Sequence, residues 1–190
     1  MSTYGIVVEG EYDESALTEI IKKCFSSEIE IIPRKCGGKD RLMAKFPAYL
    51  ASFRYAKQGS YVDKAIVIRD AHGKDPEELK RIMRGKIAGR NYPFPVKFVI
   101  IVQELEAWLL ADEEAISRIT QSRSGRVVQR VSESLECLSK PKETLYKILS
   151  EAGVAYAEAV AREIAKESDL NKIESRCRMF REFRQAVKDC

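Results

Sequence analysis

Long hydrophobic runs are absent from this sequence. The longest apolar stretches, residues 98–102 and 107–111, are far shorter than the roughly 20 residues that a membrane-spanning helix needs. The first residues also lack the basic segment and the following apolar segment of a secretory signal. We therefore expect a cytoplasmic protein that does not contact a membrane.

Histidine and paired cysteines are also scarce. His72 is the only histidine, and no two of the five cysteines have the C-x-x-C spacing of a zinc or redox site, so we expect free thiols in a reducing compartment. Hydrophobic residues make up 45% and charged residues 33% of the 190 positions, which is typical of a globular chain with its own core. The net charge of +4 is too mild to predict a nucleic-acid partner by itself.

Apolar segments alternate with segments of helical spacing in the first part of the chain. The expected strands are residues 4–9, 29–32 (ended by Pro33), 65–68 and 96–102. The expected helices are one capped by Asp13, residues 40–57 divided at Pro47, and residues 77–87 behind Asp75 and Pro76. This alternation predicts an α/β fold with a four-stranded, mainly parallel sheet covered by helices on both faces.

No strong strand pattern follows residue 112. Lys140 and Pro141 open one expected helix, residues 154–166 and 170–187 form two more, and residues 117–124 are expected to be a polar connector. We therefore expect an α/β core over residues 1–112 and a helical extension over residues 113–190, packed on the core. Three uses of the extension stay open: it could cover the sheet, form a homodimer surface or shape a substrate groove.

Acidic residues follow three of the expected strands. Glu9 follows the first, Asp70 the third, and Glu104 and Glu106 the fourth. Ligand sites of parallel sheets lie beyond the carboxyl ends of strands, and carboxylates there suit Mg²⁺ or Mn²⁺. A helix that began at Glu104 would point Glu104 and Glu106 to different sides, so at most one is expected in the site. Each acid could instead be an ordinary polar strand end or a partner for a helix dipole.

Basic residues gather after the second and third strands. Candidates for contact with a phosphate backbone are Arg34, Lys35, Lys39, Arg41, Arg81 and Arg84. The loop at Gly37 and Gly38 could also offer backbone N–H groups to a phosphate. The alternative is that these clusters are solvated helix faces and that the aromatic residues between them belong to a core.

Three stretches together resemble a known family. They are residues 7–10 (Val-Val-Glu-Gly), residues 68–73 (Ile-Arg-Asp-Ala-His-Gly) and residues 102–112, which contain Glu-Leu-Glu-Ala-Trp. The order resembles Toprim domains, which occur in topoisomerases, primases and OLD-type nucleases, and within them domain-of-unknown-function family 4276. The resemblance implies a Toprim-like, Rossmann-like core.

The resemblance also implies roles for particular residues. Glu9 would be a general acid/base or a metal ligand, and Asp70 a ligand of Mg²⁺ or Mn²⁺. Glu104 and Glu106 stay candidate ligands because of their place after the fourth strand. His72 stands where the family has a second aspartate. Because neutral imidazole is a poor ligand of Mg²⁺ but suits softer metals, His72 could bind such a metal, act as an acid/base, or mark a decayed site.

The function that these observations favour is metal-dependent phosphodiester hydrolysis or transfer on nucleic acid, in DNA repair or defence. The alternatives are a non-catalytic module that binds nucleic acid or a partner, and a nucleotide-processing phosphotransferase. We identify no domain that would supply the tyrosine of a topoisomerase. Nucleic acid is the expected partner, and a second copy of the chain and a separate protein such as an ATPase stay open as further partners.

Overall fold

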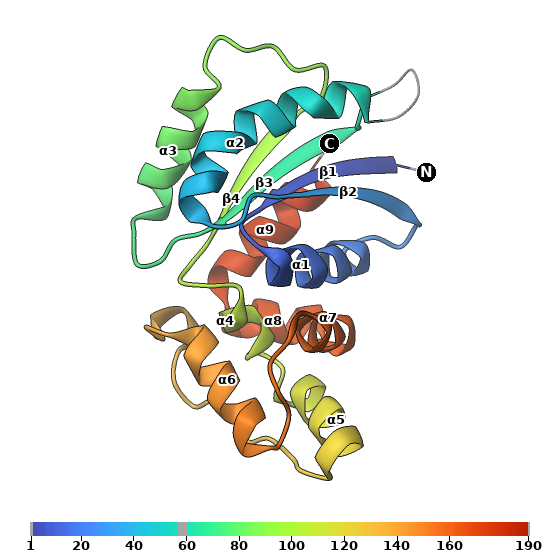
Figure 1. Cartoon of the computed structure of the whole chain (residues 1–190), viewed down its shortest axis with the longest axis vertical. Helices are drawn as coiled ribbons and strands as arrows, with labels where there is room; N and C mark the ends of the chain where they lie inside the picture. Colours follow the sequence, from blue (N-terminus) through green and yellow to red (C-terminus); the bar gives the residue numbers. More distant parts are fainter. Residues whose placement is uncertain (1, 57–60, 190) are drawn as a thin grey trace.

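A parallel sheet forms the centre of the molecule in the computed structural model, which describes residues 2–56 and 61–189 (Figure 1). Its strands are β1 (Ser2–Val8), β2 (Ile29–Lys35), β3 (Lys64–Asp70) and β4 (Val96–Ile101). They are all parallel and lie in the spatial order β2-β1-β3-β4. The expected α/β fold, with a four-stranded parallel sheet and a helical C-terminal part, is confirmed.

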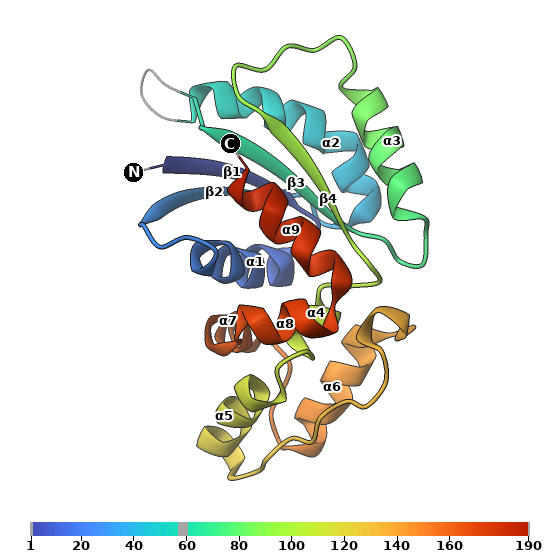
Figure 2. The same cartoon turned by 180° about the vertical axis from the view of Figure 1, so that it is seen from behind.

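Alternate side chains of the strands enter two separate cores. Ile6 and Val8 of β1 belong to one core, whereas Val7 between them belongs to the other, as the two-residue repeat of a strand requires. The helices over the first face are α1 (Glu11–Lys23) and α9 (Arg178–Lys188), and α7 (Glu158–Glu167) packs against α1 on the side away from the sheet. The helices over the second face are α2 (Lys39–Ser52) and α3 (Pro76–Lys86) (Figures 1 and 2).

The remaining elements follow the sheet in sequence or connect its parts. They are the short 3₁₀ helices η1 (Phe53–Tyr55) and η2 (Leu135–Cys137) and the helices α4 (Glu106–Leu109), α5 (Glu113–Ser124), α6 (Pro141–Glu151) and α8 (Leu170–Arg176). Within the described ranges, every helix is too short or too polar to cross a membrane. The cysteines in those ranges are free thiols, as expected, and Cys190 lies outside them.

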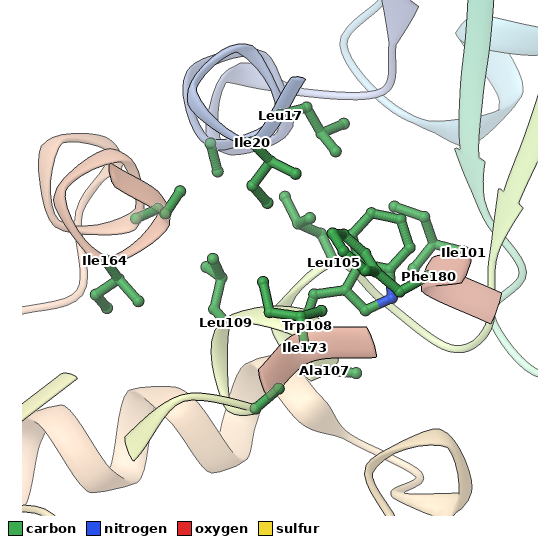
Figure 3. Close-up of a cluster of buried hydrophobic side chains, with 14 of the residues drawn as sticks. Leu17, Ile20, Ile101, Leu105, Ala107, Trp108, Leu109, Ile164, Ile173 and Phe180 are labelled. Atoms are coloured by element: carbon green, nitrogen blue, oxygen red, sulfur yellow. The ribbon is translucent and has the colours of Figure 1, made fainter. Parts of the chain in front are cut away.

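A cluster of aromatic rings joins the C-terminal helices to the sheet. Trp108 of α4 is 1% exposed, and its ring centroid lies 4.9 Å from those of Phe180 and Phe183 of α9. Leu17 from α1 and Ile164 from α7 converge on the same region (Figure 3). The first face of the sheet is therefore closed by residues from both ends of the chain. The division into a core of residues 1–112 and an extension of residues 113–190 stays a prediction.

Two lysines from the first half of the chain bind the carbonyl ends of two C-terminal helices. Lys64 is 2% exposed, and its Nζ donates to the carbonyls of Val187 (2.9 Å) and Asp189 at the end of α9. Lys23 Nζ donates to Lys166 O (2.7 Å) near the end of α7. A cation at this position satisfies carbonyls that have no partner within the helix and complements the helix dipole.

Two prolines do not interrupt their elements, so both expected breaks were wrong. β2 continues through Pro33 to Lys35 at the edge of the sheet, where one side of the strand needs no backbone N–H. α2 runs through Pro47, and burial of its apolar side chains outweighs the cost of roughly 3 kcal/mol. Lys57, the expected end of this helix, lies outside the described residues. The buried side chains of α2 are Leu42, Phe46 and Leu50.

Two expectations for the C-terminal part were also wrong. Residues 117–124 belong to helix α5, which Asp112 caps by accepting from Ala115 N–H (3.3 Å) and which Gly125 ends in the left-handed conformation. The expected single helix over residues 170–187 is two helices, because the backbone is extended at Cys177 (φ −128°, ψ 102°). This break lets α9 turn onto β4 and bury Phe180 and Phe183.

The aromatic cluster predicts a large effect of one truncation. Phe183→Ala should lower the free energy of unfolding by about 3–5 kcal/mol, because Phe183 is fully buried against Trp108. Tyr55→Ala, at a side chain that is 83% exposed, is the control and should change it by less than about 0.5 kcal/mol. Urea unfolding followed by circular dichroism measures both. Equal small effects would contradict the docking of α9 on the sheet.

Candidate functional site

The candidate site lies where β1 and β3 end. These strands are hydrogen-bonded neighbours, and the chain leaves β1 for β2 on one side but returns to β3 on the other. Such a change of direction leaves a crevice beyond the carboxyl ends of the two strands. Glu9 follows β1 and Asp70 ends β3, and the backbone N–H of Asp70 donates to Glu9 Oε1 (3.2 Å). The two acids therefore face one crevice.

Five carboxyl groups line one pocket of about 190 Å³ at this crevice. They belong to Glu9, Asp13, Asp70, Glu104 and Glu106. The remaining lining comes from Gly10, Tyr12, Gly38, His72 and Lys142. All four acids that were candidate ligands from the sequence lie here, together with His72. Asp13 joins them.

The acids reach the pocket through two local structures. Asp13 was expected to cap its helix, but it lies in the first turn of α1, where its carboxylate accepts from the N–H of the cap residue Gly10 (2.8 Å). Glu104 precedes α4 and Glu106 begins it. The expectation that only one of these two would face the site was wrong, because helical spacing does not apply to Glu104.

Burial and mutual repulsion dominate the electrostatics of the pocket. Burial raises the pKa of Asp70 well above its ordinary value, and the charges of Asp13, Glu9, Glu106 and Glu104 raise it further. Burial is also the largest cause of the raised pKa values of Glu9, Asp13 and Glu106. The negative charge of the ionised acids is therefore not fully compensated by positive charge in the pocket.

Two basic side chains lie near Glu9 without making short ion pairs to it. His72 Nε2 is 3.4 Å from Glu9 Oε2, and His72 Nδ1 is 3.9 Å from Glu104 Oε1. Arg69 is 5% exposed, and its Nε lies 3.8 Å from Glu9 Oε1 with no hydrogen-bond partner among the residues that the structure describes. Glu9 thus lies between a buried guanidinium and an imidazole.

His72 is held at the pocket by an uncommon backbone conformation. Its φ is 48° and that of Gln103 is 65°, and both lie in the left-handed region that residues other than glycine rarely adopt. The two residues are joined, because the N–H of His72 donates to the carbonyl of Gln103 (3.1 Å). Strained backbone of this kind is concentrated at functional sites, which favours a role for the loop that carries His72.

The C-terminal part contributes a cation and a tyrosine that we did not predict. Lys142 Nζ lies 3.9 Å from Glu106 Oε1 and 4.9 Å from the centre of the Tyr12 ring. The backbone N–H of Lys142 also donates to Glu104 Oε2 (3.1 Å). Tyr156, whose hydroxyl donates to Glu106 Oε1 (3.0 Å), has a pKa raised by burial and by Glu106. These groups orient the two acids that follow β4.

The donor set of the pocket fits a hard divalent cation. Carboxylate oxygens are the ligands that Mg²⁺ and Mn²⁺ prefer, and a divalent ion would relieve the repulsion among the acids. In the described ranges, however, no group of three or more His, Cys, Asp or Glu side chains is already arranged to hold a metal ion. The pocket therefore has the chemistry of a metal site without a preformed cage.

The candidate phosphate-binding residues lie outside this pocket, and two of them are paired with acids. Lys35 Nζ is 2.6 Å from Glu11, and Arg81 makes two bonds of 2.7 Å to Glu78. The N–H groups of Gly37 and Gly38 donate to the carbonyl of Glu9. The suggested use of that loop for phosphate was therefore wrong for these two groups. Contact of the basic residues with nucleic acid stays a prediction. They are Arg34, Lys35, Lys39, Arg41, Arg81 and Arg84.

These features define a class: a parallel α/β domain with an acidic pocket at its topological switch point and helices from the C-terminal part over one face. The chain belongs to the family described as Domain of unknown function (DUF4276), whose model matches residues 8–188. The family resemblance that we drew from the sequence is thereby confirmed. A search among curated proteins gave no match.

Two solved structures are similar over nearly the whole chain. The C-terminal region of the Burkholderia pseudomallei OLD protein is 15% identical with a TM-score of 0.49, over 98% of this chain and 99% of that one. The C-terminal region of the Xanthomonas campestris pv. campestris OLD protein is 12% identical with a TM-score of 0.43, over 97% of each chain. Both likenesses are weak, and the fold is established by the sheet itself.

The crowding of acids predicts how stability changes with pH. A carboxyl group whose pKa is raised by folding stabilises the folded chain in acid, and this contribution is lost as the pH rises through the folded-state pKa. In metal-free buffer, Asp70→Asn should therefore be more stable than wild type near pH 8, by about 1–3 kcal/mol, and the difference should shrink toward about pH 5.

Urea unfolding at several pH values measures this difference. The exposed Glu133→Gln is the control and should show none of it. A variant Asp70→Asn that is less stable than wild type near pH 8 would contradict the repulsion that we describe.

Proposed function

We propose that the protein is a divalent-metal-dependent phosphodiesterase that acts on nucleic acid. The observation that carries the proposal is the convergence of five carboxyl groups on one small pocket, where burial and mutual repulsion raise the pKa values of Glu9, Asp13, Asp70 and Glu106. Folding them together is unfavourable unless a cation or a proton compensates them. Metal-assisted attack on phosphate is the chemistry that such a site supports best.

Asp13, Asp70, Glu104 and Glu106 are the residues that would hold the metal. When bound, Mg²⁺ or Mn²⁺ would polarise a phosphoryl oxygen and lower the pKa of a water molecule. The oxygen atoms of these side chains come from α1, β3 and the turn after β4, so the site could gather around an ion from several directions. Lys142 and Tyr156 keep Glu106 in place.

Glu9 is the residue that we assign to proton transfer. Burial raises its pKa, and a general acid or base is most effective when its pKa is near the working pH. It accepts a hydrogen bond from the backbone N–H of Asp70 and lies 3.4 Å from His72, so both its position and its charge respond to neighbouring groups. His72 would orient Glu9 and complete the proton path.

Lys142 is the residue that we assign to the substrate phosphate. Its side chain is 53% exposed, whereas Glu9, Asp70 and Glu106 in the same pocket are buried. An ammonium group there would contact a phosphate bound over the acids and offset charge that develops during cleavage. Assembly with a second copy of the chain, or with a separate protein such as an ATPase, stays a prediction.

Metal binding and cleavage should depend on Asp70. Isothermal titration of Mg²⁺ and Mn²⁺ should show binding to wild type and loss of that binding in Asp70→Asn, because the variant lacks a ligand charge. A saturating ion should also raise the unfolding midpoint of wild type by about 5–10 °C. Cleavage of labelled DNA and RNA should fall by about 10²–10⁴-fold in Glu9→Gln and below detection in Asp70→Asn.

The exposed Glu133→Gln is the matched control for these variants and should bind metal and cleave like wild type. A wild-type chain that binds neither ion, even with nucleic acid present, would contradict the proposal.

Exchange of His72 tests which metal the site uses. Carboxylate is a better ligand of Mg²⁺ than imidazole, so His72→Asp should raise the affinity for Mg²⁺ by about tenfold or more relative to Mn²⁺. His72→Ala should lower the affinity for Mn²⁺ only if the imidazole is itself a ligand. The ratio of the two affinities, measured by titration for each variant, is the readout. An unchanged ratio in His72→Asp would show that this side chain does not reach the ion.

One observation favours a second candidate function. The described residues include no ready-made metal cluster, and His72 replaces an acid, as a non-catalytic module that binds nucleic acid would allow. In that case reversal of charge at Arg81 and Arg84 should abolish binding, whereas Glu9→Gln should leave it intact. If the protein is a phosphodiesterase, Glu9→Gln should lower cleavage more than reversal of charge at Arg81 and Arg84 does.

A further inference from the structure

A second cavity, of about 770 Å³, opens beside the acidic pocket. It runs along α6 and the segment before it, below the sheet in Figure 1, and we name it the α6 groove. Its wall includes Leu138, Lys140, Lys142, Tyr146, Lys147 and Tyr156. Aromatic rings and lysine side chains thus line this cavity together, and of these residues only Lys142 and Tyr156 have a role assigned above.

The α6 groove adjoins the acidic pocket at Lys142. Lys142 lines both cavities. Tyr156 lines the groove, while its hydroxyl donates to Glu106 Oε1 (3.0 Å) inside the pocket. A linear molecule that lies in the groove can therefore continue past Lys142 to the carboxyl groups.

The chemistry of the groove matches a nucleic-acid strand with exposed bases. The side chain of Tyr146 is 59% exposed, so its ring offers a flat apolar face to solvent. Lys140 and Lys147 flank it and are 65% and 76% exposed. Aromatic rings stack on bases of any sequence, and lysines beside them follow the phosphates. Glu143 is the acid in the groove wall, and it is paired with Lys140 (2.8 Å).

We propose that the α6 groove binds an unpaired nucleic-acid strand, with a base stacked on Tyr146 and the phosphates along Lys140, Lys142 and Lys147. This inference rests on the proposed function, because the strand would lead its next phosphate to the acidic pocket. The bases of a duplex are stacked on each other and paired, so a duplex has no free base for Tyr146. The substrate class is therefore single-stranded DNA or RNA, or a single-stranded end.

Binding in metal-free buffer tests the groove separately from cleavage. The probe is a fluorescent oligothymidylate of about 12 nucleotides, read by anisotropy with a chelator present. Tyr146→Ala should weaken binding by about tenfold, because one stacking contact is lost, whereas Tyr146→Phe should stay within about twofold of wild type. Tyr55→Ala removes another exposed ring (Tyr55 is 83% exposed, Tyr146 59%) away from the groove and should have no effect.

Salt dependence tests the lysines. Lys147→Gln should lower the slope of log affinity against log salt concentration by about 0.7, which is the contribution of one phosphate contact to a single strand. Lys22→Gln, at an exposed position of α1 outside both pockets, is the matched control and should leave the slope unchanged. A duplex of the same length should bind more weakly than the single strand and should not respond to Tyr146→Ala.

The outcomes separate the groove from the proposed function. Equal affinity of wild type and Tyr146→Ala for the single strand, or no binding by either, overturns the groove proposal, even where cleavage depends on Asp70. Binding that depends on Tyr146 in a chain that shows no metal-dependent cleavage supports the groove and contradicts the phosphodiesterase. Light scattering tests whether a second copy of the chain occupies the groove instead. A wild-type dimer that Tyr146→Ala dissociates, with unchanged binding of the oligonucleotide, also overturns the proposal.

Discussion

The confinement of five carboxyl groups in one pocket is the constraint that the rest of the structure must balance. A parallel sheet brings the carboxyl ends of its strands to one edge, so Glu9 and Asp70 become neighbours as soon as β1 pairs with β3. Their repulsion opposes folding, and the two apolar cores on either side of the sheet must outweigh it. Hydrogen bonds from Gly10, Asp70 and Tyr156 hold the acids in this arrangement rather than letting them separate. A cation bound in the pocket would compensate the negative charge of these acids.

The part of the site that follows strand ends could be predicted from the sequence. Glu9 and Asp70 each end an apolar run, and the parallel topology alone brings them together. Asp13 was missed as a site residue because its place in the first turn of a helix explained it as a cap. Lys142 lies far along the chain from the other site residues, and no local pattern connects it to them, since only the folding of α6 against α4 brings it to the pocket. Long-range contacts of this kind leave no periodic signal.

The difference between local patterns and long-range contacts also explains why some expected bounds of helices and strands were wrong. Pro33 and Pro47 carry strong local preferences, but an edge position and a buried helix face overrule them. Residues 117–124 are polar and looked like a connector, yet their backbone is helical because Asp112 and Gly125 cap the segment at both ends. The break at Cys177 has no proline or glycine to mark it, and it follows from the angle at which α9 meets β4. Local chemistry predicted which elements form, and tertiary contacts decided where they end.

The lysines that bind the ends of α7 and α9 have a consequence for how the chain is made. Lys23 and Lys64 are synthesised early, but the carbonyls that they bind appear only when α7 and α9 have left the ribosome. Until then, the first face of the sheet lacks the cover of α9, although α1 already lies over it. Co-translational folding can therefore complete the α2 and α3 side of the sheet first. The other side stays incomplete until α9 packs on β4.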